Sequence, residues 1–161
     1  MQKTLITAKK GKTSTRRTKC DEVDYVSKRS EDLALLKRMV RELVKTWSST
    51  WSSKDTSAAA RFYSKAPDLV FFDLGPTHLG WEQYQKSIER SFDTIEKLDL
   101  TLNDDLRVVV GDGMALTTAT GHISYRMKNN ENFESDIRFT GVWENKGGHW
   151  RLIHDHWSRS R

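Results

Sequence analysis

The chain has 161 residues, of which 36% are hydrophobic and 30% are charged, and its formal net charge is +5. This length suits one domain with a substantial core, and no apolar run approaches the roughly 18 residues of a membrane span. The single cysteine, Cys20, excludes an internal disulfide framework. We therefore expect one globular domain without a membrane segment and place it in the cytoplasm.

The positive charge is concentrated at the start of the chain. Residues 1–20 contain seven of the 27 basic side chains and no acidic one, which leaves 20 basic against 22 acidic side chains in the remainder. Because this segment has little to bury, residues 1–29 are predicted to form a disordered basic tail before a domain at residues 30–161. The tail could touch nucleic acid through nonspecific charge or resemble a mitochondrial presequence, but a solvated tail without a dedicated partner is the preferred interpretation.

Three helices are predicted in the first half of the domain. Ser30 can cap the first, because apolar residues then recur at three- and four-residue steps: Leu33, Leu36, Val40, Leu43, Trp47 and Trp51. Asp55 is predicted to cap a short second helix that ends before Pro67. A third helix is predicted from about Trp81.

The remaining segments have the composition of β-strands. They are residues 69–74, 98–110 (one long strand or a bulged pair), 114–127, 133–144 and 149–158. The order is two helices, a strand, a third helix and then four antiparallel strands. This order predicts an α+β domain whose helices pack on one face of the sheet.

The last strand is predicted to form one wall of a pocket. Side chains alternate along a strand, so one face would display Trp150, Leu152, His154 and His156. Two titratable imidazoles beside an aromatic ring favour a binding surface over an ordinary core. The opposite face is expected to pack on another subunit, and it would display Arg151, Ile153, Asp155 and Trp157.

The C-terminal hairpin resembles the nuclear transport factor 2-like superfamily, most closely its SnoaL-like branch and the association domain of calcium/calmodulin-dependent kinase II. The residues that match are Val142-Trp143, Gly147-Gly148, Trp150 and the His-x-His-x-Ser run from His154 to Ser158. The element order agrees from about residue 31 to residue 158. The resemblance implies a cone-shaped α+β fold, in which a curved antiparallel sheet wraps three helices, and a homodimer. Gly141 replaces the arginine of the kinase association domains, which argues against a kinase-scaffold role.

Asp73 is the main catalytic candidate. It follows an apolar strand and precedes Gly75-Pro76, as an aspartate does in the ketosteroid isomerase branch, where the resemblance implies that it moves a proton. A carboxylate beside an apolar pocket gains basicity because desolvation disfavours its charged form. The helix tyrosine of that branch falls near Trp47, so a steroid isomerase is not predicted. The alternative for Asp73 is a turn residue that accepts a local backbone hydrogen bond.

His154 and His156 are the other catalytic candidates, as an acid or a polarising group. A structural pair is the alternative, and no metal or cofactor is predicted because the spacing defines no third ligand. The residues expected to bind a ligand are Trp47, Tyr63, His122, Arg138 and Trp150. For His122 and Arg138, the alternative is a position on an exposed face of their strands.

These observations leave two functions open. The first is a small-molecule pocket protein, acting as an isomerase, dehydratase or cyclase without a cofactor and with Asp73 as its base. The second is a non-catalytic association domain that forms a homo-oligomer through its sheet. Fold alone does not choose between them, because one fold hosts many functions.

Overall fold

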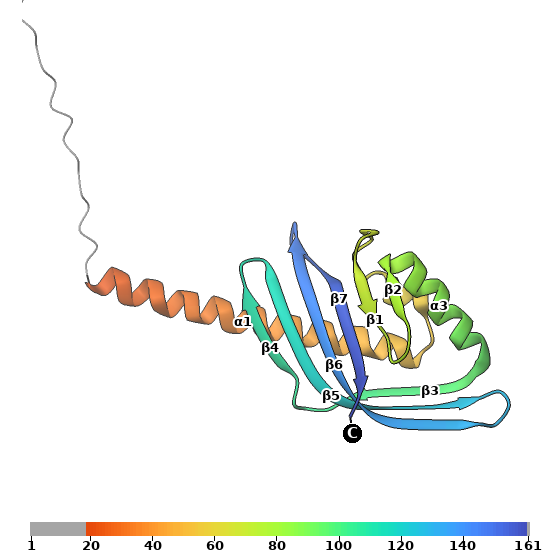
Figure 1. The fold of residues 1–161 in the computed structure, drawn as a ribbon. Coiled ribbons are helices and arrows are strands. Elements are labelled where there is room, and N and C mark those ends of the chain that lie inside the picture. Colours follow the sequence, from red (N-terminus) through yellow and green to blue (C-terminus); the bar gives the residue numbers. More distant parts are fainter. Residues whose placement is uncertain (1–18, 161) are drawn as a thin grey trace, which may run out of the picture. The chain divides into compact units, whose positions relative to one another are not determined.

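The computed structural model describes residues 19–160, with side-chain positions from residue 29 onward (Figure 1). Of the tail predicted to be disordered over residues 1–29, residues 1–18 lie outside the described part and residues 19–29 belong to a helix. The chain divides into two compact units, Met1–Asp32 and Leu33–Arg161, and the second contains the sheet. Among the described residues, no helix is long and apolar enough to cross a membrane.

The helices are α1 (Lys19–Ser52), α2 (Thr56–Ala60) and α3 (Gly80–Thr94). The first helix begins at Lys19 and not at the predicted Ser30. No glycine or proline lies between these two residues to interrupt it. The predicted cap of α2 is confirmed. The Asp55 side chain accepts a hydrogen bond of 2.8 Å from the Ala58 backbone N–H, which would otherwise lack a partner.

The strands are β1 (Val70–Phe72), β2 (Thr77–Leu79), β3 (Ile95–Leu102), β4 (Arg107–Gly111), β5 (Met114–Met127), β6 (Asn132–Lys146) and β7 (His149–Arg159). They form one curved sheet in the order β2-β1-β7-β6-β5-β3, and β4 also pairs with β5. All pairs are antiparallel except β1 with β7. This α+β architecture confirms the predicted fold class, although β2 was not predicted and the 98–110 segment contains two separate strands, β3 and β4.

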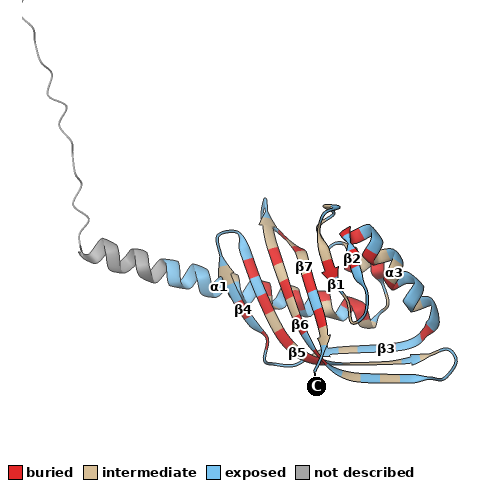
Figure 2. Ribbon diagram, in the orientation of Figure 1, coloured by how far each residue is buried: buried red, intermediate tan, exposed pale blue. Residues whose placement is uncertain are grey.

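The core lies between the helices and one face of the sheet, which we call the inner face (Figure 2). Trp47 of α1 is fully buried, and its ring centroid lies 4.7 Å from that of Phe139 and 5.7 Å from that of Trp157. Tyr84 of α3 stacks on Phe71 at 5.4 Å. The helical aromatic stripes predicted from the sequence therefore pack against alternate residues of the strands.

A β-bulge in β7 changes which residues reach the inner face. Val142 of β6 pairs with His154, whereas the next residue, Trp143, pairs with Leu152, so Ile153 has no partner. One unpaired residue shifts the alternation of side chains along a strand. The prediction that Trp150, Leu152, His154 and His156 share a face is therefore wrong. The prediction that Asp155 and Trp157 lie on the outer face is also wrong, because both are buried on the inner face.

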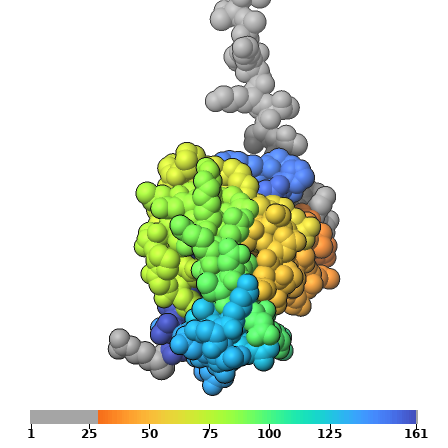
Figure 3. Space-filling view, turned by 90° about the vertical axis from the view of Figure 1, so that its right-hand side faces the viewer, coloured from red at the N-terminus to blue at the C-terminus, as the bar shows by residue number. Residues whose placement is uncertain are grey.

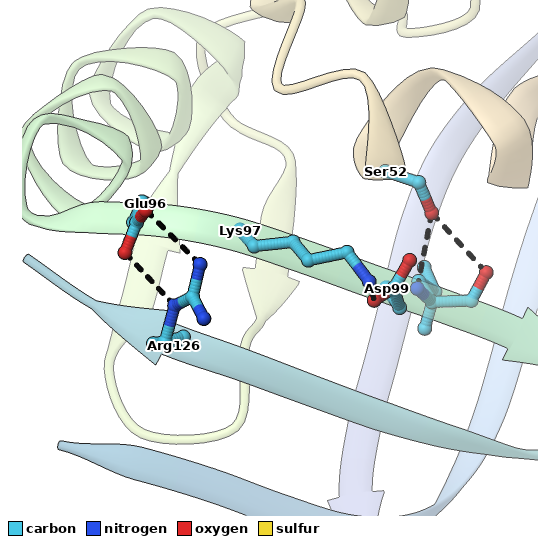
Figure 4. A network of polar contacts seen from close by, with 6 residues as sticks. Ser52, Glu96, Lys97, Asp99 and Arg126 are labelled. Atoms are coloured by element: carbon cyan, nitrogen blue, oxygen red, sulfur yellow. Dashed lines mark hydrogen bonds and ion pairs between the residues drawn. The ribbon is translucent and has the colours of Figure 1, made fainter. Parts of the chain in front are cut away.

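Polar contacts attach β3 to its neighbours (Figure 4). The Ser52 hydroxyl at the end of α1 accepts a 3.0 Å hydrogen bond from the Leu100 backbone N–H. Arg126 of β5 makes a bidentate ion pair with Glu96, with distances of 2.8 and 3.0 Å. These contacts attach β3 to the end of α1 and to β5. The apolar side chains of β3 form one wall of a pocket.

Candidate functional site

An apolar pocket of about 190 Å³ lies between the helices and the inner face of the sheet. Helix α3, green in Figure 3, contributes one of its walls. Its walls come from α1, α3, β3, β5, β7 and the segment after β1. Five aromatic rings line it: Trp51, Tyr84, Phe92, Tyr125 and Trp157. We call it the aromatic pocket. None of its lining residues, all in the described part of the chain, is a lysine, arginine or histidine.

Asp73 is the one carboxylate among the residues that line the aromatic pocket. Burial raises the pKa of Asp73, while its hydrogen bond with the Leu74 backbone and the charge of His78 act in the opposite direction. The Leu74 N–H donates to Asp73 Oδ1 at 2.7 Å, so the expected local backbone contact is present as well. No other side-chain hydrogen bond of Asp73 is found among the described residues.

Tyr84 forms the floor between Asp73 and the core. Its pKa lies well above the ordinary value, chiefly because of burial and secondly because of the charge of Asp155. Hydrogen-bonding neighbours, Tyr63 and Trp157, act in the opposite direction. Behind it, the buried ring of His78 stacks on Tyr84 with centroids 4.9 Å apart.

Asp155 lies behind this floor, fully buried on the inner face. Its Oδ2 is 2.8 Å from the Tyr63 hydroxyl, and that hydroxyl accepts a 3.3 Å hydrogen bond from Trp47 Nε1. Among the described residues, Asp155 Oδ1 has no hydrogen-bond partner. Burial raises the pKa of Asp155 to about 8, against the lowering effect of the Tyr63 hydrogen bond. The carboxyl group is therefore largely protonated at neutral pH.

Four predicted site residues lie away from the aromatic pocket. His154 is half-buried, with Nδ1 2.7 Å from the Val70 carbonyl oxygen, and His156 is exposed. His122 is exposed and pairs with Asp136 at 3.0 Å. Arg138 is exposed too, and its side chain donates to the Arg159 carbonyl oxygen. All four are on the outer face of the sheet, away from the aromatic pocket.

The three other predicted residues are in the core. Trp47, Tyr63 and Trp150 are buried, and none lines the aromatic pocket. Tyr63 still contacts its floor, because its ring centroid lies 5.8 Å from that of Tyr84. Of the eight residues proposed from the sequence, the structure thus places Asp73 in the pocket and Tyr63 one layer behind it.

The family follows from this fold and its sequence. Residues 40–160 match the model of the SnoaL-like domain family, so the chain belongs to that family. No curated protein matches the chain by sequence. The resemblance seen in the C-terminal hairpin is confirmed.

Solved structures show the same fold at low sequence identity. A nuclear transport factor 2-like superfamily protein from Salmonella enterica serovar Typhimurium superposes with a TM-score of 0.74 at 18% identity, covering 80% of this chain and 93% of that one. A candidate scytalone dehydratase from Novosphingobium aromaticivorans has a TM-score of 0.72 at 11% identity, over 81% and 89% of the two chains. The association domain of the Caenorhabditis elegans calcium/calmodulin-dependent kinase II has a TM-score of 0.61 at 18% identity, over 80% and 98%.

Sequence reasoning did not single out Tyr84, which lines the aromatic pocket, or the buried His78 and Asp155. Tyr84 lies with Trp81 and Ile88 on the buried face of α3, and this spacing alone does not distinguish a core ring from a pocket ring. His78 belongs to β2, which was not predicted. Asp155 was placed on the wrong face because the bulge at Ile153 has no local sequence signal.

Proposed function

We propose that this chain is a small-molecule pocket protein that acts as a cofactor-independent isomerase, dehydratase or cyclase, with Asp73 as the base. The observation that supports it is one half-buried carboxylate at the wall of an otherwise apolar, aromatic pocket. Desolvation makes such a carboxylate a stronger base, as its raised pKa indicates. A base of this kind removes a proton from carbon beside a carbonyl group.

The residues that line the pocket also favour a ligand without negative charge. No lysine, arginine or histidine is among the lining residues, so an anionic ligand would have no partner for its charge and would face the charge of Asp73. The rings of Trp51, Tyr125 and Trp157 favour flat or cyclic apolar groups. The ligand we propose is therefore an uncharged ring compound with an enolisable carbonyl group.

Deuterium exchange tests this function without knowledge of the natural substrate. A panel of neutral cyclic ketones is incubated with the full chain in D₂O, and the loss of α-proton signals is followed by NMR. Replacing Asp73 with asparagine removes the base, so enzyme-dependent exchange should fall by about 10²- to 10⁴-fold. Asp68→Asn is the matched control, because Asp68 is exposed and absent from the pocket lining. Equal exchange by wild type and the Asp73 variant would exclude Asp73 as the base.

The outer face of the sheet supports a second function, homo-oligomeric association. Val109, Leu116, Val142 and His154 form a continuous row across four neighbouring strands by their pairing register. Val109 is 64% exposed and Leu116 is 43% exposed. Apolar side chains gathered on one sheet face are a common feature of protein interfaces. We infer that two copies of the chain form a homodimer through this face.

Light scattering after size exclusion tests the dimer. Wild type should have twice the mass of one chain, and Leu116→Lys should shift it toward the monomer because a charge would be buried at the interface. Leu35→Lys is the control, because Leu35 is equally apolar and 53% exposed but lies on α1. A monomeric wild type at micromolar concentration would contradict the association function and leave the pocket function standing.

A further inference from the structure

The aromatic pocket holds a carboxylate whose charge has no partner in the pocket lining. Asp73 is its one ionisable acid, and every lining residue from α1, α3, β3, β5 and β7 lacks a charged side chain. Among the described residues Asp73 makes no ion pair. Burial lowers the pKa of the neighbouring His78, against the raising effect of Asp73, so this imidazole is largely neutral at neutral pH. A positive charge on a ligand would supply the missing partner.

Two aromatic rings of the pocket are also suited to a positive charge. The ring centroid of Trp51 lies 6.3 Å from that of Phe92, and the two planes are inclined at 66°. Among the described residues, neither ring is stacked face to face on another aromatic ring. The face of an aromatic ring attracts a cation, and tryptophan does so most strongly.

The number of acceptors in the lining selects the kind of cation. Besides the Asp73 carboxylate, the side-chain acceptors are three hydroxyls, those of Tyr84, Ser91 and Tyr125. A primary ammonium group has three N–H donors, and each of them would need an acceptor in an otherwise apolar space. A tertiary ammonium group has one N–H, which the carboxylate can accept, and its other substituents are apolar. The lining therefore fits a tertiary ammonium group best.

The volume of the pocket limits the rest of the ligand. A cavity of about 150 Å³ lined by apolar side chains holds one benzene molecule. The aromatic pocket, at about 190 Å³, is slightly larger. It therefore has room for one six-membered ring with a short substituent.

We propose that the aromatic pocket binds single-ring compounds that carry a tertiary ammonium group, with Asp73 as the counter-ion and the rings of Trp51 and Phe92 beside the charged nitrogen. Such a compound has no enolisable carbonyl group, so it is not a substrate of the proposed reaction. It occupies the carboxylate that the reaction needs and acts as a competitive inhibitor. Binding requires only the pocket, whereas the inhibition rests on the proposed function.

Two molecules of the same shape test the preference for charge. N,N-Dimethylbenzylamine is protonated at about pH 7, and isobutylbenzene has a CH group in place of the nitrogen. Their dissociation constants are measured with the full chain at about pH 7 by NMR titration. Wild type should bind the amine about 10- to 100-fold more tightly than isobutylbenzene, the effect of one hydrogen bond to a charged group.

Variants assign this preference to the proposed residues. Asp73→Asn removes the charge and keeps the shape, so it should bind the amine about 10- to 100-fold more weakly and leave isobutylbenzene binding unchanged. Asp68→Asn is the matched control, because Asp68 is exposed and absent from the lining, and it should retain the wild-type preference. Trp51→Phe should weaken amine binding about three- to tenfold, with a smaller effect on isobutylbenzene.

Four results would overturn the inference. They are the absence of amine binding by wild type, equal or tighter binding of isobutylbenzene, unchanged amine binding by Asp73→Asn, and ketone exchange that depends on Asp73 but continues when the pocket is saturated with the amine. The proposed function fails separately. If Asp73→Asn loses amine binding but retains wild-type ketone exchange, Asp73 is a counter-ion for ammonium compounds and is not the base.

Discussion

The Tyr63 hydroxyl lies 2.8 Å from Oδ2 of Asp155, although 92 positions separate the two residues in the chain. Both side chains are buried, and Trp47 donates a hydrogen bond to the same hydroxyl. This contact joins the segment after α2 to the last strand of the sheet, immediately behind the aromatic pocket. The stability of the fold should therefore depend on this buried polar contact.

Asp155 should make the stability of the protein depend on pH. Its pKa is about 8 when folded and about 3.9 in an unfolded chain, so between these values the folded state holds a proton that the unfolded state has lost. The stabilising effect of that proton is complete below about pH 4 and is lost as the pH rises to about 8. The free energy of unfolding should fall by up to about 1.4 kcal/mol per pH unit from this group.

Asp155→Asn should remove this part of the pH dependence, because the amide does not titrate in this range. Urea unfolding of wild type and variant across the interval provides the measurement. Asp136→Asn should retain the wild-type slope, since Asp136 is exposed. Parallel slopes for wild type and Asp155→Asn would show that Asp155 is ionised throughout.

Tyr63→Phe should destabilise the fold by about 1–3 kcal/mol, because it leaves the buried Trp47 Nε1 and the Asp155 carboxyl without their shared partner. Chemical denaturation at about pH 7 measures the change. Tyr125→Phe removes a hydroxyl from a half-buried ring that stacks on Phe133, and it should have a smaller effect. Equal losses for both variants would mean that the buried contact adds nothing specific.

Gly141→Ala should destabilise the protein by about 1–3 kcal/mol through overpacking. A Cβ at this position would lie 2.6 Å from Cζ of Phe139 and 3.0 Å from the Thr117 hydroxyl oxygen, both within the core. Larger side chains have no room at this position for the same reason. Gly75→Ala is the comparison, because a Cβ there meets nothing within 4 Å. Similar melting temperatures for the two variants would contradict the packing argument.

Proton exchange that depends on Asp73 should be lost at acidic pH. Burial raises the pKa of Asp73 above its ordinary value of 3.8, and only the ionised form accepts a proton. The acid limb of the exchange rate should therefore have its midpoint above that of a solvent-exposed aspartate. Rates measured by NMR from about pH 3 to about pH 7 locate it. A midpoint at or below the ordinary value would show that the base is not a desolvated carboxylate.

Much of the fold was predictable because its signals are local. The three- and four-residue spacing of Val40, Trp47 and Trp51 produced a stripe that the structure buries. Strand β5 was predicted with the bounds that it has, since β-forming residues fill it and Gly113 marks the turn before it. The Val-Trp, Gly-Gly and His-x-His-x-Ser pattern indicated the superfamily. The position of Asp73 was also predictable from local context, because a carboxylate that directly follows an apolar strand lies at the end of that strand.

The sequence by itself thus determined most of the elements, their order, the family and one residue of the candidate site. Only the tertiary structure decided which face of β7 is buried, because the bulge at Ile153 arises from pairing with Val142 and Trp143 on another strand. It also decided that burial raises the pKa of Asp155 beside Tyr63, since desolvation depends on residues far away in the chain. Alternation and spacing describe one segment at a time. The pocket and the buried acid come from six segments that meet only in the folded protein.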